Sequence, residues 1–418
     1  MKKVCVIGCG YIGLPMVAMF AKSGCDVIGV DREKKVVDAI NAGRVLIEEP
    51  GLAEIIRDVA SGGKLRASIV PEQADVFVIA VPTPHKPDDN YNCDLSYVLD
   101  AVNSIIPYIS KGNAVIIEST IAPRSMNDYI APCFEKAGLV IGSDVFLAHC
   151  PERVLPGNIL YELENNNKII GGITSKCAEV AAGIYKIFVK GEILTTEAKT
   201  AEMVKCMENT FRDVNIALAN ELARICDRLE INCLDVISLA NKHPRVNILS
   251  PGPGVGGHCL AIDPYFIYAQ APDIAKIIHL SRDTNKAMPQ FVVDKVKYLL
   301  SGITDPKIVA LGTAYKGNTD DTRESPALEV VKLLREEGYI VTIHDNHVKP
   351  NEILSLEDAA IDADLLLVLT DHDEYKGSSV HNVTHKMRNP IIFDTRNIID
   401  PYKDAVIYNF GNINSLKQ

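Results

Sequence analysis

The residue with the most chemistry to offer is Cys259, which stands in a loop built from glycine. Residues 251 to 264 read PGPGVGGHCLAIDP, so the thiol does not sit on the apolar stripe of a helix or strand. A free thiol titrates near pH ~8.5, so Cys259 needs a base or a nearby positive charge to attack well at neutral pH. Asp263 is suited to orient a hydrolytic water, and His258 to shape a substrate or to pack. We interpret Cys259 as a nucleophile, with an inert core cysteine as the alternative.

A second feature is the run GCGYIG at residues 8–13. It directly follows an apolar stretch at 4–7 and opens a helical stretch, and Asp31 ends the next apolar stretch. In this context the glycines let a backbone turn approach a pyrophosphate at a helix N-terminus. A carboxylate at Asp31 accepts from a ribose hydroxyl and repels a 2′-phosphate, which favours NAD over NADP. The adjacent Arg32 could pair with a 2′-phosphate, and the alternative for the glycines is a tight turn only.

Polar residues also follow three later apolar stretches. They belong to VPTP at 81–84, EST at 118–120 and HCPER at 149–153. Such positions lie at the carboxyl edge of a parallel sheet, where ligands bind. Thr83 and Thr120 are therefore candidate contacts, and Glu152 is expected near the nicotinamide. A surface salt bridge is the alternative for Glu152.

Lys205 and Asn209 are four residues apart in a helical stretch and so project from one face. Alone, such a pair is usually solvated surface. Beside a nucleophilic thiol, an ammonium and an amide can stabilise the oxyanion of a tetrahedral adduct. A reducible cofactor together with a thiol nucleophile predicts oxidation beyond the aldehyde.

The C-terminal third carries GTAYKGNTDDTRESP at residues 312–326, between a predicted strand and a predicted helix. There Lys316 and Arg323 can contact anionic groups such as phosphates. His344, His347 and His372 occur with aspartates in polar loops but without paired cysteines, so we predict no metal site.

Composition limits the function classes. The 418 residues carry a formal charge of −11 and are 47% hydrophobic, which argues against a nucleic-acid or anionic-membrane surface. Eleven scattered cysteines favour a reducing cytoplasm. Lys2 and Lys3 before an apolar stretch imitate a secretory signal, but the glycines at 8, 10 and 13 fit a strand, turn and helix instead. We expect no membrane segment.

The elements expected around these residues form an α/β protein. Apolar strands alternate with helices up to about residue 190 and again from Lys307, which predicts two Rossmann-like parallel sheets. Residues 192–243 lack Gly and Pro, and apolar residues recur every three or four positions from Met203 to Leu229, which predicts a long amphipathic helix. We interpret it as a connector and dimer core, with an internal core helix as the alternative. The predicted domains are 1–190 for NAD, 191–300 for the helical connector with the Cys259 loop, and 301–418 for a different ligand.

With these motifs assembled, the chain resembles the UDP-glucose/UDP-N-acetylmannosamine 6-dehydrogenase family from the first strand to about Asn397. The resemblance implies oxidation of the C6 hydroxyl of a UDP-linked sugar to a carboxylate by two NAD+, through a thiohemiacetal and a thioester on Cys259. It also implies a role for each motif residue. Lys205 and Asn209 would steady the oxyanion, Asp263 and Glu152 would handle protons and water, and Thr120 would support that water. Arg323 would reach NAD, Lys316 would hold the substrate, and Arg245 would come from a partner subunit of a homodimer or larger homo-oligomer.

The full predicted sets are as follows. The cofactor-binding residues are Gly8, Gly10, Tyr11, Ile12, Gly13, Asp31, Arg32, Pro82, Thr83, Ser119, Thr120 and Arg323. The substrate-binding residues are Glu152, Arg153, Lys205, Asn209, Arg245, Asn247, Gly256, His258, Tyr315 and Lys316.

The segments around 243–247 and 251–266 are similar to the branch of the family that acts on UDP-N-acetylmannosamine. In the UDP-glucose branch a Lys usually precedes the aspartate and a Ser precedes the cysteine, whereas here Ile262 and His258 stand there. UDP-N-acetylglucosamine and UDP-glucose remain alternative substrates. Two further alternatives are a two-electron 3-hydroxyacid dehydrogenase and a non-catalytic nucleotide-sugar sensor.

Overall fold

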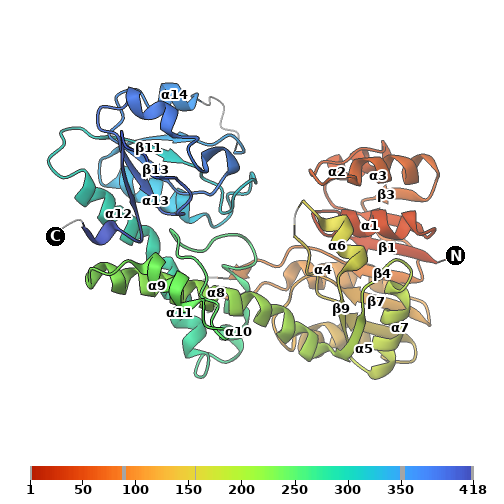
Figure 1. The fold of residues 1–418 in the computed structure, drawn as a ribbon. Helices are drawn as coiled ribbons and strands as arrows, with labels where there is room; N and C mark the ends of the chain where they lie inside the picture. Colours follow the sequence, from red (N-terminus) through yellow and green to blue (C-terminus); the bar gives the residue numbers. More distant parts are fainter. Residues whose placement is uncertain (1, 87–90, 156, 349–353, 416–418) are drawn as a thin grey trace. The chain divides into compact units, whose positions relative to one another are not determined.

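The computed structural model describes residues 2–86, 91–155, 157–348 and 354–415. Its contacts divide the chain into two compact units. The first comprises Met1–Glu208 and Tyr265–Ala271, and the second comprises Asn209–Pro264 and Pro272–Gln418. Figure 1 follows the chain through both units.

The first unit is built on an eight-stranded sheet in the order β10-β9-β8-β7-β4-β1-β2-β3. The strands are β1 (Lys3–Ile7), β2 (Asp26–Val30), β3 (Leu65–Ser68), β4 (Val76–Ile79), β7 (Asn113–Ile117), β8 (Val145–His149), β9 (Lys168–Gly172) and β10 (Ile193–Glu197). In the part of the sheet that runs β8-β7-β4-β1-β2-β3, every neighbouring pair of strands is parallel. Strand β9 pairs antiparallel with β8. The alternation of strand and helix predicted the parallel part but does not specify the direction of strands near a sheet edge, where an antiparallel strand is common.

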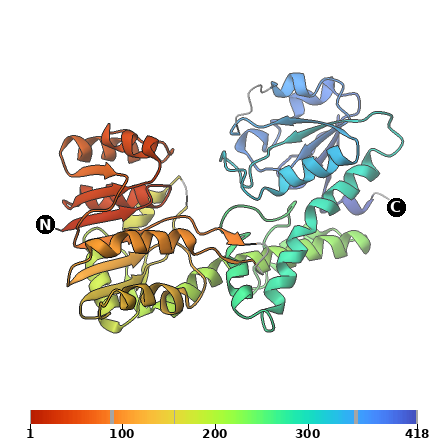
Figure 2. The same ribbon diagram turned by 180° about the vertical axis from the view of Figure 1, so that it is seen from behind.

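Helices cover both faces of this sheet, as Figures 1 and 2 show from opposite sides. They are α1 (Gly13–Lys22), α2 (Lys34–Asn41), α3 (Leu52–Ser61), α4 (Ser96–Ile105), α5 (Ala131–Lys136), α6 (Ile159–Asn165) and α7 (Ser175–Tyr185), with a small hairpin of β5 (His85–Lys86) and β6 (Asn92–Cys93). Successive strand residues belong to different cores: Val4 and Val6 pack with helices α1, α3, α6 and α7, and Cys5 and Ile7 pack with α4 and α5. Because both faces are buried, the strands read as continuous apolar runs.

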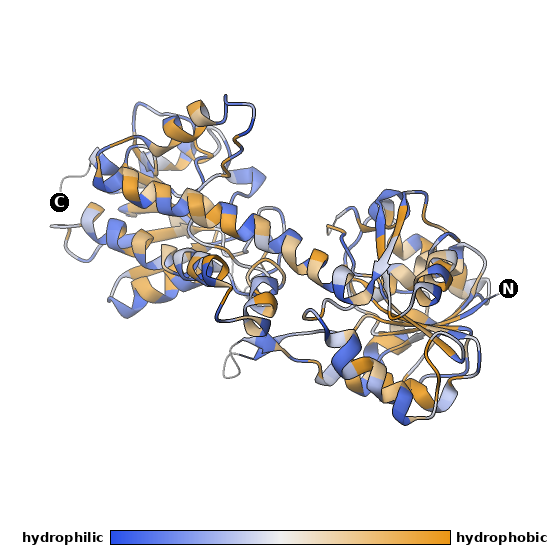
Figure 3. Ribbon diagram, turned by 90° about the horizontal axis from the view of Figure 1, so that it is seen from below, coloured by the Kyte–Doolittle hydropathy of each residue, from blue (hydrophilic) through white to orange (hydrophobic). Residues whose placement is uncertain are grey.

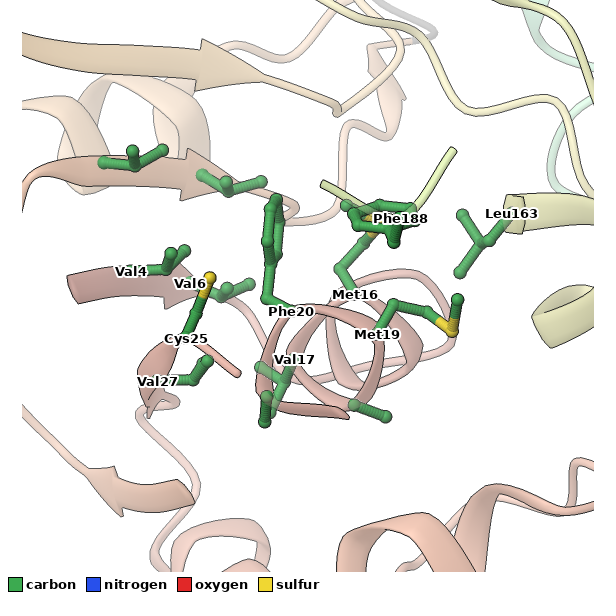
Figure 4. Packing of buried hydrophobic residues seen from close by; sticks show 14 of the residues in the cluster. Val4, Val6, Met16, Val17, Met19, Phe20, Cys25, Val27, Leu163 and Phe188 are labelled. Carbon is green, nitrogen blue, oxygen red and sulfur yellow. The ribbon is translucent and has the colours of Figure 1, made fainter. Parts of the chain in front are cut away.

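The core beside α1 is aromatic and tightly packed. Phe20 meets Phe188 edge to face, with ring centroids 5.0 Å apart, and Val4 and Val6 lie beside Phe20 (Figure 4). Burying α1 in this way holds its N-terminus, and with it the glycine turn, at the carboxyl end of β1.

The second unit contains a five-stranded parallel sheet in the order β12-β11-β13-β14-β15. Its strands are β11 (Lys307–Leu311), β12 (Ile340–His344), β13 (Leu365–Val368), β14 (Ile391–Asp394) and β15 (Val406–Asn409). The remaining helices are α8 (Ala198–Arg228), α9 (Cys233–Ala240), α10 (Asp263–Gln270), α11 (Lys276–Lys286), α12 (Met288–Leu299), α13 (Pro326–Glu336) and α14 (Leu356–Ala359). Hydrophilic and hydrophobic residues alternate along the helical ribbons in Figure 3.

The two Rossmann-like sheets and the long helix confirm the predicted fold class. The helix α8 has 31 residues and ends at Arg228, and α9 follows it as a separate short helix. Strands β3, β10 and β15 were not predicted: all three are edge strands, and LRAS and ILTTE carry little apolar signal. Within the described residues, no helix combines the length and apolar character that crossing a bilayer requires.

Candidate active site

Each glycine of the turn after β1 is required for a different steric reason. Gly8 has a φ of +92°, and a Cβ there would stand 2.6 Å from the Ala80 carbonyl oxygen. A Cβ on Gly13 would overlap the Gly8 carbonyl, whereas one on Gly10 would meet nothing within 4 Å. The outer glycines therefore shape the turn, and Gly10 leaves its backbone open to a ligand, as a dinucleotide-binding turn requires. Tyr11 and Ile12 follow at the start of α1, and Tyr11 is exposed.

Asp31 follows β2 and holds this turn in place. Its carboxylate accepts hydrogen bonds from the backbone N–H groups of Cys9 and Glu33, both at 2.9 Å. A carboxylate has about four acceptor positions, so the ribose hydroxyl can still be bound. The Arg32 guanidinium lies over the Tyr97 ring, 5.0 Å from its centroid.

The ends of β4 and β7 form the next part of this edge. The Ser119 hydroxyl donates to the Val81 carbonyl at 2.7 Å, which ties the EST segment to the VPTP segment. Thr83 and Thr120 are half-buried beside this link, and Pro82 is exposed. The carboxyl ends that the sequence predicted to meet are thus neighbours in the sheet.

The HCPER segment after β8 is anchored from several sides. Arg153 donates to the Glu208 carboxylate on α8, at 3.1 Å from Nε, with Nη2 2.8 Å from the other oxygen. His149 Nδ1 donates to the Ile117 carbonyl at 2.9 Å, and burial, with a smaller contribution from the Lys205 charge, lowers the pKa of His149 to about 4. Lys205 is therefore close to this segment. Glu152 is buried and pairs with Lys168, so it is not the surface salt bridge that the sequence left open.

In the second unit, the Cys259 loop packs closely against the 312–325 segment. A Cβ on Gly256 would stand 2.9 Å from Tyr315 Cβ, and one on Gly257, whose φ is +85°, would stand 2.8 Å from the Tyr315 ring. The Gly257 N–H donates to the Arg323 carbonyl at 3.0 Å. Only glycine allows this approach, which is why a sequence of small residues precedes the thiol.

Cys259 is half-buried, in contrast to nine of the other ten cysteines, and Cys133 is the other partly exposed one. Its carbonyl accepts from the Asp263 N–H at 2.8 Å, so a single turn joins the thiol residue to the start of α10. The Asp263 carboxylate accepts from Asn209 Nδ2 at 2.6 Å, and both side chains are buried. Three of the predicted catalytic residues therefore share one neighbourhood.

A buried polar network holds the loop that leads to Cys259. Gly252 N–H donates to Asn220 at 2.9 Å, Asn220 donates to Asn285 at 2.8 Å, and Asn285 donates to Asp213 at 2.8 Å. Arg282 pairs with the same Asp213 carboxylate at 2.5 Å. Sequence reasoning missed these residues because a polar residue in a helical stretch carries no sign of its distant partner.

The Arg323 guanidinium is held by Asp321. Its Nε and Nη2 donate to the two Asp321 oxygens at 2.9 and 2.6 Å. Burial alone would raise the pKa of Asp321, but these hydrogen bonds lower it. The pKa of Arg323 is raised mainly by the Asp321 hydrogen bond, and Cys259 and Tyr315 add to this.

The other predicted substrate residues are exposed. His258 Nδ1 lies 3.8 Å from the Asp321 carboxylate, and Lys316 projects from the same segment. Arg245 and Asn247 lie beyond α9, where Asn215 of α8 donates to the Asn247 carbonyl at 3.3 Å.

Among the described residues, His347, His372 and Glu374 could together face a metal ion. The Asn318 N–H donates to His372 Nδ1 at 2.9 Å, so the proton of the neutral ring is on Nε2, which lies 3.4 Å from Asp345. A metal at Nε2 would require the loss of that proton as well. The donor chemistry therefore favours a hydrogen-bonded histidine over a metal ligand.

Comparison with known proteins agrees with these features. Residues 2–189 match the NAD binding domain of the UDP-glucose/GDP-mannose dehydrogenase family, residues 199–287 match its central domain, and residues 309–401 match its UDP binding domain. The chain belongs to this family. The predicted resemblance and the prediction of NAD as cofactor are thereby confirmed, and this family member is an NAD-dependent UDP-sugar dehydrogenase.

Individual relatives extend over almost the whole chain. A UDP-N-acetyl-D-mannosamine dehydrogenase of Methanococcus vannielii is 49% identical, over 96% of this chain and 93% of its own length. An NDP-N-acetyl-D-galactosaminuronic acid dehydrogenase of Ralstonia nicotianae is 43% identical, over 94% of this chain and 96% of its own. The solved derivative structure of the UDP-N-acetyl-mannosamine dehydrogenase Cap5O from S. aureus is 50% identical, with a TM-score of 0.94 and full coverage of both chains.

Proposed function

We propose that this family member oxidises the C6 hydroxyl of UDP-N-acetyl-D-mannosamine to the carboxylate, with two NAD+ consumed per sugar. The observation that carries the proposal is the half-buried Cys259 on a glycine loop, one turn from the buried Asn209–Asp263 pair. The sugar is favoured by the names of the relatives at 49% and 50% identity, and by the His258 and Ile262 positions.

The proposed mechanism uses the side chains described above. Bound NAD+ supplies the hydride acceptor in each of two oxidations. The Cys259 thiolate adds to the aldehyde carbon formed first, giving a thiohemiacetal whose oxidation yields a thioester. Water then cleaves the C–S bond, which releases the carboxylate and regenerates the thiol.

The remaining residues stabilise charge and move protons in this proposal. Asn209 and Lys205 donate to the oxyanion of the tetrahedral adducts, a contribution worth roughly 10² to 10³ in rate for each donor. Asp263 and Glu152 accept protons from the hydroxyl and the hydrolytic water, and Thr120 supports that water. Arg323 interacts electrostatically with Cys259, so in this proposal its charge assists thiolate formation in addition to the proposed cofactor contact.

A homodimer is the assembly we propose. Along α8, Phe211, Leu218 and Ile225 recur at seven-residue intervals and are 65%, 55% and 46% exposed. An apolar stripe with this spacing is suited to pack against a second copy of the same helix. Arg245 is then proposed to reach the substrate of the partner subunit. The cysteines form no disulfide, which supports a reducing cytoplasm as the place of action.

To test this proposal, the purified protein is incubated with NAD+ and one UDP-sugar at a time, and the NADH formed per sugar is measured. The sugars are UDP-N-acetylmannosamine, UDP-N-acetylglucosamine, UDP-N-acetylgalactosamine and UDP-glucose. Two NADH per sugar and a uronate product are expected with the first. Cys259→Ser should abolish turnover and retain UDP-sugar binding, whereas Cys133→Ser, a change at the other partly exposed cysteine, should leave turnover intact.

Three outcomes would contradict the proposal. One NADH per sugar with accumulating aldehyde would indicate a two-electron dehydrogenase. Unchanged carboxylate production by Cys259→Ser would exclude sulfur as the nucleophile. No NADH with any sugar would favour a nucleotide-sugar sensor.

A further inference from the structure

Glu152 belongs to a cluster of five buried ionisable side chains. Glu118 follows β7, Cys150 and Glu152 follow β8, Lys168 begins β9, and Tyr185 ends α7. All five are at most 8% exposed. Four separate elements thus bring two carboxyl groups, one ammonium, one thiol and one phenol into a single buried cluster.

The contacts within the cluster are unequal for the two carboxylates. Lys168 Nζ lies 2.5 Å from Glu152 Oε2 and 4.0 Å from Glu118 Oε1, and it also lies over the Tyr185 ring, 5.1 Å from the centroid. The Tyr185 hydroxyl donates to Glu118 Oε1, whereas Glu118 Oε2 is buried without a hydrogen-bond partner. Glu152 is therefore the carboxylate that Lys168 holds, and Glu118 is the second, less satisfied one.

One ammonium cannot stabilise two buried carboxylates equally well. Burial raises the pKa of Glu118 to about 7, the Lys168 charge opposes this rise, and the Glu152 charge adds to it. For Lys168, burial alone would lower the pKa, but the charges around it, Glu152 first, raise it. The ammonium thus stays charged, and near neutral pH the change in protonation falls on Glu118.

This cluster contains Glu152 and lies next to Thr120 in the sequence, and both are proposed catalytic residues of the first unit. Glu118 directly precedes Ser119 and Thr120 at the carboxyl edge of the sheet. The other Glu152 oxygen, Oε1, accepts from the Arg153 N–H at 2.6 Å, so both oxygens of this carboxylate have fixed donors. Without Lys168, the buried Glu152 carboxylate would have no counter-charge, and an uncompensated buried charge is costly.

We propose that Lys168 is a positioning residue that keeps the Glu152 carboxylate ionised and in place, and that Glu118, by competing for the same ammonium, weakens the hold of Lys168 on Glu152. The inference rests on the proposed role of Glu152 as a proton acceptor. Cys150 and Tyr185 are the other titratable groups that face Glu118, and burial raises the pKa of the Cys150 thiol to about 12, so it stays protonated.

The first experiment measures kcat against pH for wild type, Lys168→Met, Lys168→Arg and Glu118→Gln. On the acidic side of the pH–kcat profile (the acid limb), Lys168→Met should shift the pH of half-maximal kcat to higher pH by more than about one unit. It should also lower kcat at pH 7 at least about tenfold, with partial recovery at higher pH. Lys168→Arg retains the charge and should keep the limb near its wild-type position. Glu118→Gln removes the competing carboxylate and should shift the acid limb to lower pH.

The opposite shifts distinguish this role from a merely structural one. A structural defect in Lys168→Met would reduce kcat by the same factor at every pH and leave the limb in place, which would overturn the inference. Lys168→Arg behaving like Lys168→Met would do the same, since the proposal depends on the charge.

The second experiment needs no turnover and compares unfolding of wild type and Glu118→Gln from pH 5 to pH 8. Because the folded pKa of Glu118 is raised above the unfolded value, its contribution to stability is full at low pH and is lost as pH rises through about 7. The ratio of the two unfolding equilibrium constants should therefore change more than about tenfold over this range, in favour of the glutamine variant at pH 8. Glu179→Gln, an exposed change on α7, is the control and should give a constant ratio.

The two experiments separate the possible failures. Parallel stability curves and unmoved limbs in an active enzyme would overturn this inference alone. Absence of turnover with every UDP-sugar would overturn the proposed function, and with it the catalytic role of Lys168, even if the stability curves diverge.

Discussion

Asn209 donates a hydrogen bond from Nδ2 to Oδ2 of Asp263 at 2.6 Å, across 54 residues of sequence. The proposed oxyanion donor and the proposed proton acceptor are therefore one hydrogen-bonded pair. Because both side chains are buried, neither can lose its partner without leaving an unsatisfied polar group.

The first prediction concerns this pair. Asn209→Ala and Asp263→Ala should each lower kcat by about 10² to 10³, and the double variant should lose little more than either single one, because the two groups act together. Steady-state kinetics of the three variants measure the coupling. Arg224→Ala, an exposed change on the same helix, is the control. Fully additive losses would show that the two side chains work independently.

Cofactor choice provides the second prediction. Asp31→Asn keeps an acceptor for one of the two backbone N–H groups but removes the charge that repels a 2′-phosphate. The KM for NAD+ should rise about tenfold, and kcat/KM for NADP+ relative to NAD+ should rise by at least as much, since Arg32 remains beside the site. Asp26→Asn, at the other end of β2, should change neither constant. An unchanged ratio would remove Asp31 from cofactor discrimination.

The third prediction is a pH dependence of stability from His149. Burial lowers its folded pKa to about 4, so the unfolded chain binds the proton more readily. The stability associated with the neutral ring is present above pH ~6.5 and is lost as pH falls toward about 4, by about 3 kcal/mol in total. His149→Gln should lack this loss when thermal unfolding is followed from pH 7 to pH 4. His385→Gln, an exposed histidine, should follow wild type, and identical curves for all three proteins would refute the assignment.

The fourth prediction addresses assembly. Phe211→Glu with Leu218→Glu places two charges on the exposed apolar stripe of α8 and should convert a dimer to a monomer in sedimentation experiments. Activity should fall with the dimer, because Arg245 is proposed to act on the partner's substrate. Tyr161→Glu, an equally exposed aromatic position on α6, is the control. A monomeric wild type would contradict the proposed interface.

Local pattern was enough to predict the glycine turn, the alternation of strands and helices and the presence of a long helix, and to nominate Cys259 as the candidate nucleophile, but not the bounds of α8, since 193–197 form β10 and α9 is separate. These features depend on residues close in the chain: a φ of +92° at Gly8 demands glycine, and helical periodicity places Lys205 and Asn209 on one face. The same locality explains why the edge strands β3 and β10 escaped prediction, since edge strands need little apolar character.

Folding in three dimensions was needed to show which distant residues meet. Lys168 begins an apolar strand, and nothing near it in sequence indicates that it lies between Glu118 and Glu152. The contact arises because β7, β8 and β9 are neighbours in the sheet, with β9 reversed, so that the start of β9 lies at the same edge as the ends of the other two. The residue types alone thus nominated the candidate reactive groups, whereas strand order and burial set their partners and their charge.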